Sequence, residues 1–197
     1  MTPVARLLFA LTAIIAIPVS GALAQVIEPK IVVLAAPKDP AQDAVLIGRT
    51  NSDGLALQLE IEGSEAMWMP MGTPAKWREH APTKNERFHV EFKVTDLTTK
   101  TRLPYALVTF SAKNTDTGKT VKLVLPPMWG SSGLHYSDNS ALAGDGTYSA
   151  TVTVGVPSFA REMKDKDLWS KPVIGKFHFK LKDSKVIEVS EPIAPPS

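Results

Sequence analysis

Residues 88–94 read FHVEFKV, a strict alternation of apolar and polar side chains. Successive side chains of a β-strand point to opposite faces of its sheet, so the apolar residues share one face and His89, Glu91 and Lys93 share the other. A strand with one apolar and one polar face is typical of an antiparallel sheet that packs against a second layer. This segment therefore predicts a half-buried strand.

The same period-two pattern recurs along the chain. Residues 54–63 alternate Leu and Ile with other side chains, and further strands are expected at 104–112, 119–125, 145–156 and 173–182. Residues 113–118, KNTDTG, contain the Asn, Asp and Gly that a hairpin turn needs. Short strands separated by turns, without a long helical pattern, predict an all-β protein. A β-sandwich is the favoured architecture, and a closed barrel is the alternative.

The N-terminus has the pattern of a secretory signal peptide. Arg6 supplies a positive charge, residues 7–19 are almost wholly apolar, and Ala22-Leu23-Ala24 matches the small-x-small cleavage pattern. The apolar run is shorter than the roughly 20 residues that a membrane span needs. We expect cleavage after Ala24 and an exported, soluble protein without a membrane span. A retained N-terminal anchor is the alternative.

Composition narrows the range of partners. The formal net charge is +2, and the chain contains no cysteine. A balanced charge gives no strong field for nucleic acid or an anionic membrane. Without disulfides, an exported domain depends on its core for stability.

We expect four segments: a signal peptide (1–24), an extended lead-in (25–53), a β-sandwich domain (54–190) and a Pro-rich tail (191–197).

Two stretches contain candidate metal ligands. His89 and Glu91 would lie roughly 6.6 Å apart along one strand face, so both side chains must lean inward to bind one ion. Met128 and His135 belong to residues 126–136, PPMWGSSGLHY, whose Pro, Gly and Ser residues predict a loop. A thioether with an imidazole suits copper, with ferrous iron also possible. The alternatives are a solvated strand face, a buried methionine and a surface histidine.

Other candidate residues give weaker signals. Met67, Met69 and Met71 form either a copper-attracting cluster or soft packing. His80 is expected in a loop and receives no role, and His178 is expected to be solvated among lysines. The sequence lacks a nucleophile–base signature, a Gly-rich phosphate loop and an HExxH pattern. We therefore expect a protein that is not an enzyme.

Several short motifs occur in a recognisable order. They are His89-Val90-Glu91, the turn at 113–118, Met128 with Gly133-Leu134-His135-Tyr136, Asp145-Gly146-Thr147-Tyr148, and Trp169-Ser170-Lys171-Pro172. In this order they resemble the periplasmic iron-transport proteins, a family of exported copper- and iron-binding β-sandwiches associated with high-affinity iron permeases. The resemblance runs from about Leu57 to Lys180.

The resemblance implies a fold, a site and an assembly. It implies an immunoglobulin-like β-sandwich that forms a homodimer, with metal sites near the interface. Its ligand pattern carries over to Glu91, Met128 and His135, with His89 beside the site. The ions implied are Cu²⁺ and iron, as Fe²⁺ or Fe³⁺.

The sequence departs from the family pattern at a fourth ligand position. The family has a histidine after an arginine near the C-terminal strand, whereas here Arg161 is followed by Glu162. If the loop 157–172 folds back over the site, Glu162 would bind the ion or hold a water on it. Carboxylate oxygen favours harder ions than imidazole nitrogen does. Ser132 and Ser137 also replace residues that are usual in the family.

Two classes of function follow. The first is a periplasmic metal-binding protein that acts in iron uptake and hands iron to an inner-membrane permease. The alternative is an exported β-sandwich binding module, or a copper chaperone, with a degenerate metal site. The three methionines at 67–71 are the feature that would favour a chaperone.

Overall fold

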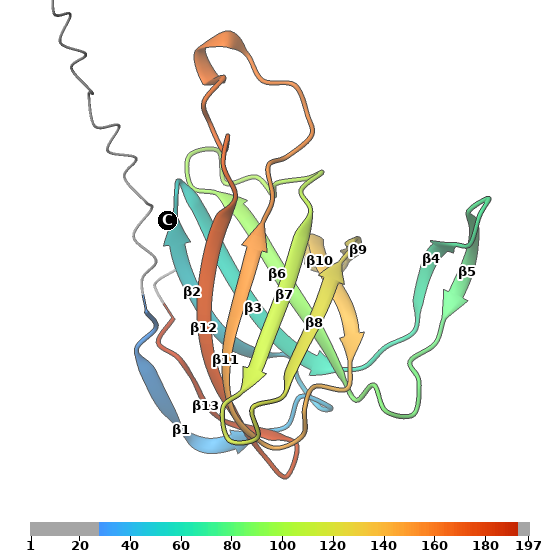
Figure 1. Ribbon diagram of the computed structural model, residues 1–197, viewed down its shortest axis with the longest axis vertical. Helices are drawn as coiled ribbons and strands as arrows, with labels where there is room; N and C mark the ends of the chain where they lie inside the picture. Colours follow the sequence, from blue (N-terminus) through green and yellow to red (C-terminus); the bar gives the residue numbers. More distant parts are fainter. Residues whose placement is uncertain (1–27, 193–197) are drawn as a thin grey trace, which may run out of the picture.

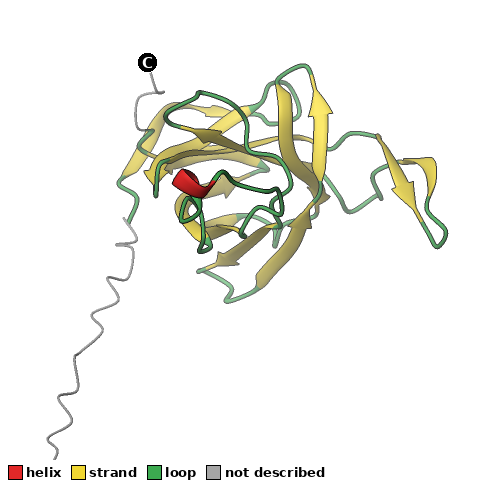
Figure 2. Cartoon of the chain, turned by 90° about the horizontal axis from the view of Figure 1, so that it is seen from above, coloured by secondary structure: helices red, strands yellow, loops and turns green. Residues whose placement is uncertain are grey.

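The computed structural model describes residues 28–192, which form strands and one short 3-10 helix (Figures 1 and 2). The elements are β1 (Ile31–Lys38), β2 (Val45–Ser52), β3 (Leu55–Gly63), β4 (Met67–Met71), β5 (Lys76–His80), β6 (Phe88–Asp96), β7 (Val108–Asn114), β8 (Thr120–Leu125), β9 (Pro127–Gly130), β10 (Gly133–Ser140), β11 (Gly146–Val154), η1 (Met163–Asp165), β12 (Val173–Lys182) and β13 (Lys185–Ser190). The predicted all-β class is confirmed.

Two antiparallel sheets make a sandwich. The larger has the order β1-β13-β12-β11-β7-β8, and the smaller has the order β2-β3-β6-β10-β9. They are separate sheets, so the sandwich is confirmed over the closed barrel. A third, two-stranded sheet, β4–β5, is a hairpin that projects away from the sandwich (Figures 1 and 2).

The core lies between the two sheets. All four apolar residues of the segment 88–94 are buried, as their alternation predicts. Phe92 of β6 meets Phe177 of β12 edge to face, with ring centroids 6.0 Å apart and an interplanar angle of 83°. This geometry is favourable for aromatic pairs and adds to the hydrophobic contribution of both rings. The polar side chains of β6 consequently face away from the core.

Several segments differ from their predicted structure. The expected lead-in contains β1 and β2, and Val45 and Ile47 of β2 are buried in the core. Residues 126–136 form most of the β9–β10 hairpin rather than a loop. Pro127 fits there because β9 is the edge strand of its sheet, where a missing N–H is tolerated. The strands β4, β5 and β13 were not predicted.

The proposed signal peptide, its cleavage site after Ala24 and most of the Pro-rich tail fall in residues 1–27 and 193–197, outside the described residues. Between residues 28 and 192, no helix has the length and apolar character needed to cross a bilayer.

A buried tyrosine ties β10 to the segment that joins β6 to β7. The Tyr136 hydroxyl donates to the Leu103 carbonyl (2.8 Å) and accepts from the Ala106 N–H (3.1 Å).

Tyr136→Phe should lower the free energy of unfolding by about 1–3 kcal/mol, because both buried backbone groups lose a partner. Urea denaturation would measure the change. Tyr105→Phe is the matched control, since Tyr105 is 70% exposed. Equal stability of the two variants would contradict the prediction.

Candidate metal centre

Glu91, Met128 and His135 gather on the outer face of the smaller sheet. Strands β6, β10 and β9 are neighbours, and their register places Ser137 opposite Glu91 and Met128 opposite His135. The Nε2 atom of His135 lies 3.9 Å from Oε2 of Glu91. Three side chains singled out in sequence thus come from three adjacent strands and form one cluster.

The cluster is shielded from solvent although it lies on an outer sheet face. His135 is 4% exposed and Glu91 is 7% exposed, while Met128 is half-buried. The alternative of a solvated strand face is therefore wrong for this part of β6. Buried polar side chains need hydrogen-bond or charge partners. The partners that His135 and Glu91 already have therefore decide which of their atoms are free to bind an ion.

The β9–β10 turn orients the His135 ring. Its Nδ1 lies 2.9 Å from the carbonyl oxygen of Gly133, which can only accept, so Nδ1 carries the hydrogen. Nε2 then presents its lone pair toward Glu91. A Cβ atom on Gly130 would lie 3.1 Å from Cε1 of His135, so the glycine leaves room for the ring. Metal-binding histidines are typically oriented in this way by a hydrogen bond from the second ring nitrogen.

Two serines that depart from the family pattern contact the cluster. Ser137 Oγ donates to the Met128 sulfur at 3.1 Å, which fixes the thioether beside His135. Ser132 Oγ donates to Oε1 of Glu91 at 3.0 Å. Ser132 and Ser137 therefore each donate a hydrogen bond that positions a candidate ligand.

Sequence reasoning missed the basic residue in the cluster. Lys93 Nζ lies 2.7 Å from Oε1 of Glu91 and also pairs with Glu60 of β3. Burial alone would raise the pKa of Glu91, but the hydrogen bond and positive charge of Lys93, with the hydrogen bond from Ser132, act in the opposite direction, and the pKa lies below its usual value. Glu91 is therefore ionised at neutral pH, and an entering cation would share it with Lys93. The signal was available, because Lys93 lies two residues from Glu91 on the same face.

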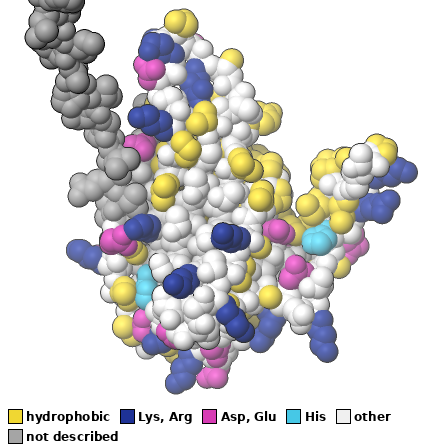
Figure 3. Space-filling model, viewed as in Figure 1, with side chains coloured by type: hydrophobic (Ala, Val, Ile, Leu, Met, Phe, Trp, Pro, Cys, Tyr) yellow, Lys and Arg dark blue, Asp and Glu magenta, His cyan; other side chains and the backbone are white. Residues whose placement is uncertain are grey.

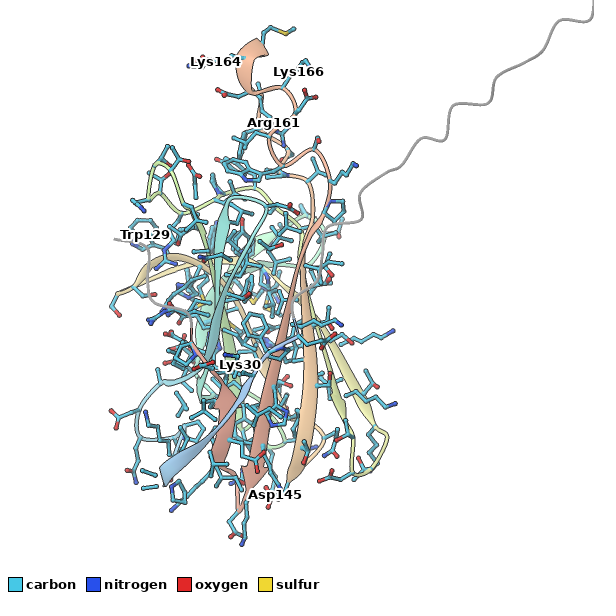
Figure 4. The ribbon with its side chains drawn as sticks, turned by 90° about the vertical axis from the view of Figure 1, so that its left-hand side faces the viewer. Lys30, Trp129, Asp145, Arg161, Lys164 and Lys166 are labelled. Carbon is cyan, nitrogen blue, oxygen red and sulfur yellow. The ribbon has the colours of Figure 1, made fainter. Side chains whose placement is uncertain are left out.

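The other two predicted ligands do not contact the cluster. His89 is fully buried and contacts Asn139 and Glu65 rather than the cluster. Glu162 precedes η1, its side chain is 75% exposed, and its carboxylate pairs with Lys164 at 3.2 Å. Figure 4 shows this loop, with Arg161, Lys164 and Lys166, projecting beyond the end of the sandwich. The expectation that the loop brings Glu162 to the site is not met in this structure.

Two further expectations need correction. His178 is not solvated: its Nε2 lies 3.1 Å from Oε2 of Glu188, and its side chain is 12% exposed. The partner comes from β13, one of the strands that were not predicted. His80 ends β5 rather than lying in a loop. Met67 is buried, which favours packing for that methionine.

Comparison with known proteins places the chain in a family. The sequence profile of the Fe²⁺ transport protein family matches residues 58–181. The chain belongs to this family. The resemblance noted from its motifs is thereby confirmed. UPF0423 proteins of Brucella abortus and Brucella melitensis are 30% identical over 115 residues, which cover 50% of this chain and 63% of theirs. The chain thus spans less than two thirds of the length of these relatives.

Solved structures share the sandwich. FetP of uropathogenic Escherichia coli strain F11 matches with a TM-score of 0.59 and 22% identity, covering 71% of this chain and 96% of FetP. The copper-reconstituted P19 protein of Campylobacter jejuni matches with a TM-score of 0.59 and 23% identity, covering 71% and 96%. These similarities show that the chain has the same fold as FetP and P19. The family is described as one of Fe²⁺ transport proteins, and the P19 structure is that of the copper-reconstituted protein.

The donor set of the cluster fits a transition-metal ion. It combines a thioether, an imidazole with a free Nε2 lone pair and an ionised carboxylate, from Met128, His135 and Glu91. Thioether and imidazole together favour copper, and imidazole with carboxylate also suits iron.

Proposed function

We propose that this chain is an exported, periplasmic metal-binding protein that binds copper and iron through Glu91, Met128 and His135. The observation that carries the proposal is the convergence of these side chains on adjacent strands, with His135 Nε2 3.9 Å from the Glu91 carboxylate. Ligand sites built on strands are held more precisely than sites on loops. Membership of the Fe²⁺ transport protein family supports a role in iron uptake.

The proposal extends to the cargo and its destination, which the family resemblance supports. Iron is the transported ion and passes to an inner-membrane iron permease, while copper bound at the same centre has a structural or redox role. The protein acts as a homodimer. Glu91 binds the ion as a carboxylate, Met128 supplies a soft ligand and His135 supplies nitrogen. Lys93 pairs with both Glu91 and Glu60 and offsets one of their two negative charges, which lowers the electrostatic cost of burying two carboxylates together.

A second candidate function rests on the β4–β5 hairpin. Trp68 and Trp77 are 67% and 62% exposed on it, and Figure 3 shows hydrophobic side chains gathered on this projection. Exposed aromatic residues are enriched where proteins dock. This surface favours the alternative of an exported binding module, or of a copper chaperone that uses Met69 and Met71 on the same hairpin.

Deleting the gene should slow growth under iron limitation, and added iron should restore it. The reason is that a periplasmic iron carrier matters only when the metal is scarce. A plasmid copy of the wild-type gene should restore growth, whereas a copy encoding His135→Ala should not. Growth curves in chelator-treated medium would measure this. A defect that arises under copper excess, with normal iron uptake, would favour the chaperone. Rescue by His135→Ala equal to wild type would favour the binding module.

A further inference from the structure

A second group of candidate ligands lies beside the centre on the same sheet face. Glu62, Glu65 and His89 each offer a ligand atom, and these atoms all lie within 4.8 Å of one another. The β3–β6 register places Glu62 directly opposite His89, and Glu65 follows the end of β3. The three side chains share no member with the cluster of Glu91, Met128 and His135.

The hydrogen bonds of Asn139 decide which nitrogen of His89 carries the hydrogen. Asn139 Nδ2 donates to the Glu65 carbonyl at 2.8 Å, and its Oδ1 accepts from the Glu65 N–H at 3.2 Å. These two backbone contacts fix the amide orientation. The same Oδ1 lies 3.1 Å from Nδ1 of His89. Because an amide oxygen can only accept, Nδ1 is the donor and Nε2 holds a lone pair.

This lone pair points into the acidic group without a partner. His89 is 0% exposed, and within residues 28–192 its Nε2 has no hydrogen-bond partner. The nearest carboxylate oxygen, Oε1 of Glu65, is 3.6 Å away, which is too long for a hydrogen bond. Two ligand atoms held on one ion by ~2.1 Å bonds at a tetrahedral angle lie roughly 3.4 Å apart. The observed spacing is that of two ligands of a common ion.

Charge at this position favours a cation. Glu62 and Glu65 both belong to the group, and the neighbouring Glu60 and Glu91 lie opposite each other on the same sheet face. Negative charge is therefore crowded here, while Lys93 pairs with Glu60 and Glu91. The Glu65 side chain is about half exposed, which gives an ion a route from solvent.

We propose that Glu62, Glu65 and His89 form a second site for a divalent first-row ion of the Mn²⁺, Fe²⁺ or Zn²⁺ type. One imidazole and two carboxylates, without sulfur, suit such ions better than they suit copper in its reduced form. His89 is thereby assigned to this second site and not to the centre of Glu91. Because the two sites use different side chains, either can fail without the other.

Zn²⁺ titration followed by the imidazole NMR signals tests this in the intact chain, which has four histidines. The His89 signals should shift with Zn²⁺, and Glu65→Gln should raise the Zn²⁺ concentration needed at least tenfold. Glu65→Gln should leave the response of His135 unchanged. Glu79→Gln, an exposed glutamate of β5, is the matched control and should change neither response. Glu62→Gln provides a second test, with the same expected loss.

Three results would overturn the second site. The first is a His89 signal that Zn²⁺ does not move, whatever His135 does. The second is an unchanged His89 response in both Glu65→Gln and Glu62→Gln. The third is a joint shift of His89 and His135 that disappears in Glu91→Gln, which would mean one shared ion. A silent His135 with a responsive His89 would keep the second site, and the same titration with Cu²⁺ would then decide the proposed function: a His135 that Cu²⁺ does not move either would reject it.

Discussion

Replacing His135 with alanine should weaken Cu²⁺ binding at least a hundredfold, which corresponds to about 2.7 kcal/mol. His135 supplies the nitrogen ligand of the centre, and its Nε2 lone pair is already directed toward Glu91. Changes that only reorient a metal ligand typically cost 10–100-fold in affinity, so loss of the ligand itself should cost at least as much. Isothermal titration calorimetry with Cu²⁺ at neutral pH would measure the loss.

His178→Ala is the matched control for His135→Ala. His178 also lies against a glutamate, Glu188, with a distance of 3.1 Å, but on the larger sheet. Its loss should leave Cu²⁺ affinity within about twofold of wild type. Met128→Leu keeps the side-chain volume and removes the sulfur, and it should weaken Cu²⁺ more than Zn²⁺ because the thioether is a soft ligand. Wild-type affinity in His135→Ala would reject this centre.

The sequence predicts the central strands well because their alternation is strict. The pattern at 88–94 places Phe92 in the core and Glu91 on the outer face, and both positions are found. The β9–β10 hairpin was missed because Pro127, Gly130 and Gly133 are read as loop residues. An edge strand accepts such residues, but whether a strand lies at an edge depends on the whole sheet.

The candidate site was predictable only in part, for a similar reason. Met128 and His135 are seven residues apart, and they face each other because the chain turns between Gly130 and Gly133. Sequence spacing alone does not locate that turn. The role of Glu65 and the pairing of Lys93 with Glu60 depend on contacts between segments that are distant in sequence, which local patterns do not reveal. Glu162 was selected by its place in a motif, and the structure leaves it exposed on a projecting loop.

Phe177→Ala should lower the free energy of unfolding by about 3–5 kcal/mol, the usual cost of removing a buried aromatic ring. Phe177 is 2% exposed, and its ring packs edge to face on Phe92 between the two sheets. Urea denaturation without metal would measure the change. Phe159→Ala is the control, because Phe159 is only partly buried at the edge of the core and should cost less. Equal losses in the two variants would contradict the assignment of Phe177 to the centre of the core.

Phe177 lies on the opposite sheet from the metal centre, so its loss should destabilise the fold without removing a ligand. An ion that binds only the folded chain stabilises it by about 2.7 kcal/mol at a hundredfold excess over its dissociation constant. Cu²⁺ at that excess should therefore recover a large part of the stability lost in Phe177→Ala. The double variant Phe177→Ala with His135→Ala should show no such recovery. Recovery that persists in the double variant would mean that Cu²⁺ stabilises the protein elsewhere.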